Sequence, residues 1–527
     1  TSRIEFVMGK LQVPLRVLLA VALCAGARGT NVFLEGRSVI VQLFSWKWTD
    51  IKKECVNFLG PHGYAAVQVS PPNEYVIAWE PEWNTAIKRP WWEMYQPVSY
   101  KLHSRLGNMA EFVDMVKICN KAGVRIIVDA VINHMSGVWP NGTLATGGSS
   151  FASDVEWYPS VPYNPEHFGD SLCSTASGNI EDFDDSDQVR DCKLVGLNDL
   201  NHRSPHVVNT IADYMNDLIE LGVAGFRIDA AKHMWPRALT DIKSKLKHLS
   251  IYAGFEPQTE ALIYQEVIPS GTIDSSEYFS IGMVTEFRYG THLARCFRRN
   301  DAIMWLSNFG EAWGMIPSES ALVFLDNHDT QRDHRIRILT FRDAKLYKMA
   351  QAFSLAWPYG MVRVMSSYYW EKSIHNDEDI NNWMGPPHDE NYNIADVVTY
   401  SDLSCGNNWI CEHRWRQVYN MVKFRQVVEG QPMKNWWNGT PHQIAFCRGN
   451  KGFIVINNDD KAVDTHLQTC LPAGLYCDVI SGNYSADHCQ GKVVNVDDAG
   501  VAKIILNPDE FDGVLAIHEG SRIDFSD

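Results

Sequence analysis

The sequence predicts an α/β protein: a (β/α)8 TIM barrel, with a small domain inserted after strand 3 and a C-terminal antiparallel β-sandwich. Three observations indicate this fold class. Eight short β-branched runs alternate with helical patterns, and a long loop-rich segment follows the third run. After about residue 432, short strands separated by turns replace the helical patterns.

Each of the eight runs is long enough for one strand and rich in the branched residues that favour strands. Parallel neighbours need a crossover connection, and the helical patterns between the runs supply it. The expected strands lie at residues 38–44, 65–70, 124–131, 223–230, 261–268, 282–287, 321–329 and 361–367.

The segment between the third and fourth runs contains the insertion and then a helix. Ser204 is placed to cap this helix, Pro205 to occupy its first position and Gly222 to end it. Before the helix lie about 70 residues rich in Gly, Pro, Ser, Asn and Asp, far more than an ordinary strand-to-helix connection needs. We expect the barrel at residues 30–132 and 201–431, the inserted domain at 133–200 and the sandwich at 432–527.

Residues 1–29 are typical of a secretory signal peptide with a few upstream residues, Met8 being the expected natural start. Lys10 and Arg16 precede a short apolar run at 17–24, and small residues follow it. No later run is long and apolar enough for a membrane anchor. We therefore expect a secreted, extracellular protein.

Charge and composition indicate which classes of binding partner the protein can have. The formal net charge is −16 at pH 7, which disfavours nucleic acids and anionic membranes. The 18 Trp residues mostly suit a core, although aromatic faces also bind the CH surfaces of sugars. We expect a monomer that binds neither nucleic acid nor membrane.

The 12 cysteines suit an oxidising compartment and no zinc pattern is present. Cys24 lies in the expected signal peptide, and Cys296 is the odd one of the remainder. Close spacing favours the pairs Cys173–Cys192, Cys405–Cys411 and Cys477–Cys489, while Cys55, Cys119, Cys447 and Cys470 could form two more.

Four of the expected strands end in polar residues that their apolar bodies do not require. In a barrel of this type, side chains from several strand ends converge on one face. One such motif alone could simply cap the following helix. Four in one barrel make that explanation improbable. The motifs are DAVINH at 129–134, RIDAAKH at 227–233, QE at 265–266 and DNHD at 326–329.

Three carboxylates at one barrel mouth, from Asp229, Glu266 and Asp329, suggest glycosidic bond cleavage. One acid must donate a proton to the leaving oxygen while another stays ionised to attack the sugar carbon. Arg227 shares a strand face with Asp229, so we expect its charge to keep that nucleophile ionised. Glu266 follows apolar residues and is the better candidate for the acid/base. His134 and His328 can donate hydrogen bonds to sugar hydroxyls.

In this order, DAVINH, GFRIDAAKH, YQEVI and FLDNHD resemble the four signature segments of the alpha-amylase family of glycoside hydrolases. The resemblance to animal-type, chloride-dependent secreted members extends across the mature chain, through PWWEMYQPVSYKL, VRDCKLVGLNDL, RVMSSY and CEHRWRQVYNMV. It implies endo-hydrolysis of alpha-1,4-glucosidic bonds in starch, glycogen and maltooligosaccharides by a retaining mechanism.

The resemblance also implies residue roles. Asp229 would be the nucleophile, Glu266 the acid/base and Asp329 the stabiliser of the transition state. Trp91, Trp92 and Tyr95 resemble a stacking platform, although a Trp pair is otherwise commonly core. The positions that match substrate-binding polar residues are Gln96, His134, Arg227, Lys232, His233 and His328.

Two ions are implied by the same resemblance. A structural Ca²⁺ would take oxygen ligands from Asn133, Asp199 and the carbonyls of Arg190 and His233, as a hard cation requires. The alternative is that Asn133 and Asp199 cap loops. A chloride ion would lie among Arg227, Asn327 and Arg363, where two arginines would otherwise repel.

The sequence departs from vertebrate relatives in three places. Residues 331–340 replace a glycine-rich mobile loop with a shorter glycine-free one, in which His334 is a candidate replacement contact. His103 stands where those relatives have a cysteine. Cys447 and Cys470 resemble an additional disulfide that brackets two neighbouring strands, and for the other two cysteines we predict Cys55–Cys119.

Two other functions are alternatives to endo-hydrolysis. A non-catalytic carbohydrate-binding relative would lose the carboxylates, yet Asp229, Glu266 and Asp329 are all present. An exo-acting alpha-glucosidase or a transglycosylase should close one end of its cleft, and the long segment 74–89 is the candidate for such closure.

Overall fold

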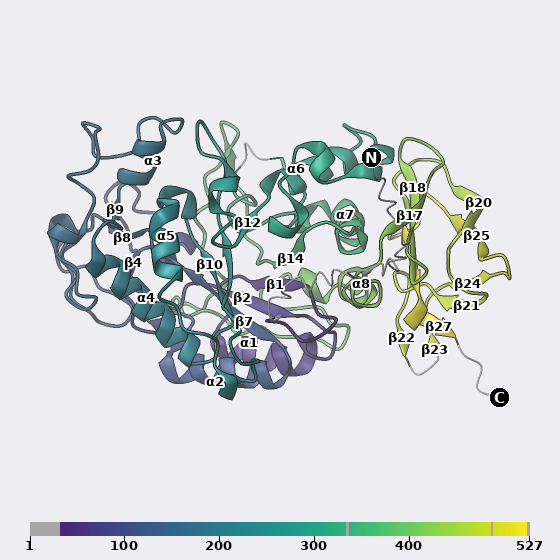
Figure 1. Cartoon of the computed structure of the whole chain (residues 1–527), viewed down its shortest axis with the longest axis horizontal. Helices are drawn as coiled ribbons and strands as arrows, with labels where there is room; N and C mark the ends of the chain where they lie inside the picture. The colour runs from purple at the N-terminus through teal and green to yellow at the C-terminus, as the bar shows by residue number, and fades with distance from the viewer. Residues whose placement is uncertain (1–31, 334–336, 486–487, 524–527) are drawn as a thin grey trace, which may run out of the picture.

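The computed structural model describes residues 32–333, 337–485 and 488–523. The expected signal peptide and His334 lie outside these ranges. Eight parallel strands close into a barrel in the order β1-β14-β13-β12-β11-β10-β7-β2, which confirms the predicted barrel (Figure 1). Their bounds are β1 Ile40–Leu43, β2 Ala66–Val69, β7 Arg125–Ala130, β10 Gly225–Ile228, β11 Leu262–Gln265, β12 Met283–Thr285, β13 Ala321–Val323 and β14 Met361–Ser366.

The barrel strands are apolar because both of their faces are covered. β1, β2, β7 and β10 are buried at every position. The register sets Arg227 of β10 beside Asp129 of β7 on one side and Tyr264 of β11 on the other. Asp229 and Glu266 directly follow β10 and β11, so the strand register brings the polar ends to one face of the barrel.

Eight α-helices accompany the strands in the described ranges. The helix expected after the insertion is α4, and Pro205 is its first residue. Ser204 occupies the N-cap position but makes no capping hydrogen bond with its side chain. Gly222, with φ of 100°, allows the chain to turn into β10. The helices are α1 Trp48–Glu54, α2 Met109–Lys121, α3 Ser186–Asp191, α4 Pro205–Glu220, α5 Pro236–Lys243, α6 Phe287–Phe297, α7 Lys345–Ala356 and α8 Arg416–Val427.

The segment inserted after β7 has little regular structure. It contains the antiparallel pair β8 (His134–Gly137) and β9 (Leu197–Asp199), together with α3. These elements lie at one end of the molecule and the C-terminal strands at the other, with the barrel between them (Figure 1).

Two antiparallel sheets form the C-terminal part, which confirms the expected sandwich. They enclose a second apolar core that includes Phe453, Leu467 and Ile504. One sheet has the order β17-β18-β19-β26, with β17 Met433–Asn438, β18 Gln443–Arg448, β19 Gly452–Asn457 and β26 Val514–His518. The other has the order β20-β25-β24-β21-β27, with β20 Val463–Gln468, β25 Val501–Leu506, β24 Val493–Val496, β21 Gly474–Cys477 and β27 Arg522–Ile523.

Short two-stranded pairs decorate this framework. They are β3 Glu74–Tyr75 with β4 Pro97–Ser99, β5 His103–Ser104 with β6 Gly107–Asn108, β15 Ile374–His375 with β16 Glu378–Asp379, and β22 Tyr484–Ser485 with β23 His488–Cys489.

All the disulfides except Cys55–Cys119 close short loops of the chain. Cys296 is buried and unpaired, as expected for the odd cysteine. Among the described residues, no helix is long and apolar enough to cross a membrane. The disulfides are the five expected pairs: Cys55–Cys119, Cys173–Cys192, Cys405–Cys411, Cys447–Cys470 and Cys477–Cys489.

Candidate active site

A cavity of about 430 Å³ opens at the carboxyl ends of the barrel strands. All three candidate carboxylates line it, together with the aromatic and histidine residues expected there. A concave site with convergent acids and aromatic walls suits a sugar chain. The lining residues are Trp91, Trp92, Tyr95, His134, Phe183, Leu194, Val195, Leu197, Asp229, Ala230, Lys232, His233, Glu266, Ile268, His328 and Asp329.

Arg227 organises the carboxylates from beneath the cavity. Its side chain is 1% exposed and does not line the cavity, so it contacts the acids rather than solvent. Nη1 lies 2.7 Å from Asp229 Oδ1 and 2.6 Å from Asp129 Oδ1, and Nη2 lies 2.9 Å from Glu266 Oε2. The backbone N–H of Ala230 also donates to Glu266 Oε2 at 3.0 Å. One guanidinium therefore fixes three carboxylates.

Burial and Arg227 act in opposite directions on the pKa of Asp229. Burial raises the pKa of Asp229 well above its ordinary value, while Arg227 opposes the rise and the charges of Glu266 and Asp129 add to it. Arg227 divides its charge among three acids, so it does not outweigh burial at Asp229. The prediction that Arg227 keeps this aspartate ionised therefore stays a prediction, because burial acts against the guanidinium.

Asp329 approaches the cavity beside His328. His328 Nε2 lies 3.1 Å from Asp329 Oδ2, and Nδ1 lies 3.0 Å from Gln42 Nε2. Burial and nearby arginines lower the pKa of His328 well below its ordinary value, so the ring is neutral and can donate one N–H. Burial, reinforced by the Glu266 charge, raises the pKa of Asp329 to about 7.

Aromatic rings form one wall of the cavity. Tyr95 stacks on His328, with ring centroids 5.2 Å apart, and its hydroxyl donates to Asp129 Oδ2 at 2.8 Å. Trp91 packs edge-on against both rings. His134 also faces the cavity, but its Nε2 lies 3.0 Å from the Tyr95 carbonyl oxygen. Burial lowers the pKa of His134 to about 4, so it too is neutral.

The remaining polar candidates fall into two groups. Lys232 and His233 line the cavity, and His233 Nδ1 lies 2.9 Å from the Val189 carbonyl oxygen. Gln96 does not line it. Its Oε1 instead accepts hydrogen bonds from Trp139 Nε1 at 2.7 Å and from the Gly137 backbone at 3.2 Å. The structure thus gives Gln96 a role in holding β8 in place.

The calcium candidates gather where α3 meets the barrel. Asn133 Oδ1 is buried and has no hydrogen-bond partner, and Asp199 is a buried carboxylate whose pKa is raised by burial and by Asp191. The described chain has no cluster of three or more His, Cys, Asp or Glu side chains suited to a metal. Amide and carbonyl oxygens would therefore complete a site, as Ca²⁺ accepts.

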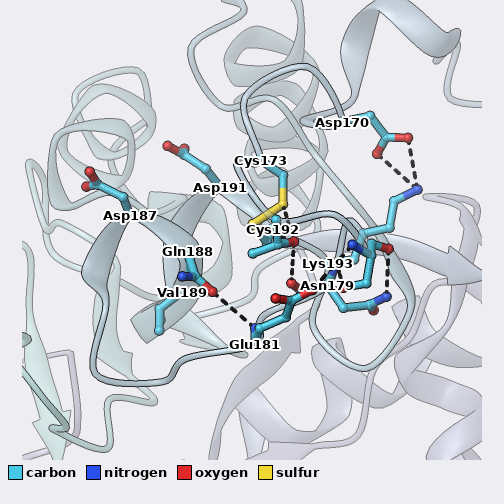
Figure 2. Close-up of a disulfide and its surroundings, with 12 residues drawn as sticks. Asp170, Cys173, Asn179, Glu181, Asp187, Gln188, Val189, Asp191, Cys192 and Lys193 are labelled. Carbon is cyan, nitrogen blue, oxygen red and sulfur yellow. Dashed lines mark hydrogen bonds and ion pairs between the residues drawn. A yellow bond between two sulfur atoms is a disulfide. The ribbon is translucent and has the colours of Figure 1, made fainter.

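Covalent and ionic links hold the segment that carries the Arg190 carbonyl. Figure 2 shows the Cys173–Cys192 disulfide and the ion pair between Lys193 and Asp170. Lys193 Nζ lies 2.9 Å from Asp170 Oδ1. The Arg190 side chain donates to Glu277 at 2.9 Å. These links keep α3 beside the barrel, and the unpaired Asn133 Oδ1 and the buried Asp199 carboxylate are the oxygen donors there that suit a hard cation.

Arg363, one of the three chloride candidates, is a second buried arginine. Arg363 Nη1 donates to Gln68 Oε1 at 2.8 Å, but its buried Nε and Nη2 have no partner. Burial, with the charge of Arg227, lowers the pKa of Arg363. Asn327 is also buried. Its Nδ2 lies 3.4 Å from Oδ2 of Asp329, which lines the cavity. Unpaired N–H groups on a buried cation fit an anion.

Comparisons with known proteins point to one family. Residues 95–369 match the model described as "Alpha amylase, catalytic domain", and residues 435–518 match "Alpha amylase, C-terminal all-beta domain". The chain is 51% identical over 497 residues to the pancreatic alpha-amylase of Sus scrofa, covering 93% of this chain and 96% of that protein. The chain belongs to the alpha-amylase family.

Two further relatives of this alpha-amylase family member extend the comparison. A pancreatic alpha-amylase of Homo sapiens is 50% identical over 515 residues, covering 96% of this chain and 99% of that one. A variant of alpha-amylase I from Eisenia fetida, solved in complex with maltohexaose, superposes with a TM-score of 0.87 at 44% identity. That match covers 93% of this chain and 99% of the other.

Sequence reasoning missed part of the site of this alpha-amylase family member. Asp129 was noticed only as the start of a motif, yet it shares Arg227 with the catalytic candidates. Phe183 and Val195, two apolar residues that line the cavity, gave no sequence signal because they lie in loops without periodicity, and Ile268 was expected only as the last residue of the strand at 261–268. Arg332, in the glycine-free segment, is buried and donates to the His328 carbonyl at 2.6 Å. This part of the segment is therefore packed against the barrel.

Proposed function

We propose that the chain hydrolyses internal alpha-1,4-glucosidic bonds of starch and glycogen with retention of the alpha configuration. The observation that carries the proposal is the convergence of Asp229, Glu266 and Asp329 on one cavity, with the first two on a single guanidinium. Two carboxyl groups on one guanidinium favour the short separation of retaining enzymes, about 5–5.5 Å, over the longer one of inverting enzymes. The names of the relatives supply the substrate class.

In the first step, Asp229 is the nucleophile and Glu266 the acid. A carboxylate oxygen of Asp229 bonds to the anomeric carbon as the bond to the leaving oxygen breaks, and Glu266 transfers its proton to that oxygen. In the second step, ionised Glu266 takes a proton from water, whose oxygen attacks the same carbon and breaks its bond to Asp229. The sugar leaves as the alpha anomer, and both acids regain their starting states.

The other cavity residues position the sugar. Asp329 and the neutral N–H of His328 hold the hydroxyls of the reacting glucose unit, while Trp91, Trp92 and Tyr95 present aromatic surface to the chain. The pKa of Asp229 is raised, and the proposed mechanism requires this residue to be ionised. Arg227 is the group that opposes protonation there, and its removal is therefore the most informative change.

Two ions complete the proposal. Asn133, Asp199 and the carbonyls of Arg190 and His233 would hold Ca²⁺. The ion would neutralise Asp199 and would link the inserted segment to the turn at Ala231–His233, which follows β10. A chloride ion held by Arg227, Asn327 and Arg363 would supply negative charge between two buried cations. Because Arg227 also contacts Glu266, we expect chloride to influence the pH profile.

The remaining assignments concern the whole chain. We propose domain bounds of 30–132 with 201–431 for the barrel, 133–200 for the inserted domain and 432–527 for the sandwich. The family and the five disulfides support a secreted, extracellular protein. We also propose that it is a monomer without nucleic-acid or membrane partners.

A long alpha-1,4-glucan with blocked ends tests the proposed function. An endo-acting enzyme cleaves it internally and releases a series of oligosaccharides, whereas an exo-acting enzyme finds no free end. Chromatography of the products, with and without chloride, distinguishes these outcomes. Absence of cleavage would reject endo-hydrolysis.

A further inference from the structure

The segment after β3 forms an ordered projecting loop. Glu80 N–H donates to the Ile87 carbonyl at 2.8 Å, and Arg89 N–H donates to the Ala78 carbonyl at 2.9 Å, so its two arms pair like a hairpin. Ile87 is 2% exposed and anchors one arm. The tip is therefore held in place by its own backbone hydrogen bonds rather than left as an unsupported turn.

Trp83 stands at the tip of this loop with 70% of its surface exposed. Its ring pairs with Trp92 in a stacked arrangement, with centroids 6.1 Å apart and an interplanar angle of 29°. Face-to-face contact would bring ring atoms to about 3.5–4 Å, so the two rings are offset rather than one covering the other. Since Trp92 lines the catalytic cavity, the aromatic surface continues outward from the cavity to Trp83.

The neighbours of Trp83 suit a carbohydrate. Glu82, Asn84 and Thr85 are exposed beside it and can exchange hydrogen bonds with hydroxyl groups. Trp79 on the same loop behaves differently, because its ring packs edge-on against Tyr392 at 5.0 Å. Trp79 thus has a packing role, whereas the ring of Trp83 is presented to solvent.

We propose that Trp83 is an outer binding platform for an alpha-1,4-glucan chain, extending the cleft beyond Trp92. The occupant is the distal part of the same glucan whose inner units lie at Asp229 and Glu266. This inference rests on the proposed function and assigns to it a determinant of chain-length preference. Long glucans reach Trp83, whereas short ones occupy only the inner platform.

Binding to a catalytically disabled chain tests this assignment. In a Glu266→Gln background, calorimetry compares maltoheptaose and maltotriose before and after Trp83→Ala. We expect affinity for maltoheptaose to fall by about 3- to 10-fold, the worth of an aromatic contact, and affinity for maltotriose to stay unchanged. Trp83→Phe, which keeps an aromatic face, should recover most of the loss.

Trp305 provides the matched control, since it is 54% exposed and does not line the cavity. Trp305→Ala should leave both affinities unchanged. Equal maltoheptaose affinity with and without Trp83 would overturn the platform and leave the ring for another occupant, and an equal loss for both sugars would overturn its link to chain length. Cleavage of blocked glucan by the chain with Glu266 intact tests the proposed function separately. Failure there, with the affinity pattern preserved, would reject hydrolysis but keep the platform.

Discussion

Replacement of Arg227 by Gln tests the charge arrangement of the site. The guanidinium lies 2.7 Å from Asp229, 2.6 Å from Asp129 and 2.9 Å from Glu266, all in a buried setting. An opposite charge at such distances changes the pKa of a carboxyl by about 1–3 units. Asp229 must be ionised to attack. Loss of the Arg227 guanidinium should therefore lower kcat at pH 7 by about 10- to 1000-fold.

The assay is the pH–rate profile on soluble starch. We expect the acidic limb of kcat/KM to move to higher pH in Arg227→Gln and to move less in Arg227→Lys, which keeps the charge. Removal of a buried ion-pair partner also destabilises the fold by about 3–5 kcal/mol, so folding is checked by circular dichroism.

Arg125 offers a control for this stability effect. It is also buried, at the start of β7, where it donates to backbone carbonyls such as that of Gly254 at 2.7 Å. Arg125→Gln should destabilise the barrel without moving the acidic limb. An acidic limb in Arg227→Gln that coincides with that of the unchanged chain would refute the reasoning.

Four further predictions follow from the site and from one buried histidine. Glu266→Gln should abolish hydrolysis while starch still binds in a pull-down, and near-normal turnover would exclude Glu266 as the acid. Dialysis into chloride-free buffer should lower activity and shift its pH optimum, and an unaffected profile would count against the anion site. Calcium chelation should lower the Tm, since a ligand at 1,000 times its Kd stabilises by about 4 kcal/mol; Asp199→Asn should remove that dependence, and a chelator effect that survives in this variant would place the ion elsewhere. Burial and Lys423 lower the pKa of His518 to about 3, so the unfolded chain binds a proton below about pH 6.5 that the native chain excludes. The native state therefore loses about 2 kcal/mol of unfolding free energy between pH 6.5 and pH 5. In urea titrations, His518→Gln should reduce this loss. The same loss in the variant and in the unchanged chain would contradict the role of His518.

The barrel was predictable because its signals are local. Each strand is a short buried run, and each polar strand end interrupts an apolar pattern, so residues such as Asp229 and Glu266 stand out in the chain. Parallel strands then bring these ends to one face of the barrel, and this does not depend on the conformation of the loops. The resemblance supplied the roles, which periodicity alone does not carry.

The features that could not be predicted depend on contacts between residues that are far apart in the chain. The protonation of Asp229 depends on how Arg227 divides its charge with Asp129, which lies 98 residues before Arg227 in the chain but in the adjacent strand. Ser204 has a capping position and a capping residue type, yet its side chain makes no cap bond. The Trp83 pairing joins the loop after β3 to the cleft, and nothing local in the sequence reveals it.

Proton NMR of the first product from end-blocked alpha-1,4-glucan tests the central claim most directly. Retaining cleavage by Asp229 and Glu266 predicts that the reducing end appears initially as the alpha anomer, with the beta signal growing only by mutarotation. An initial beta signal would contradict the double displacement, and with it the assignment of Asp229 as nucleophile.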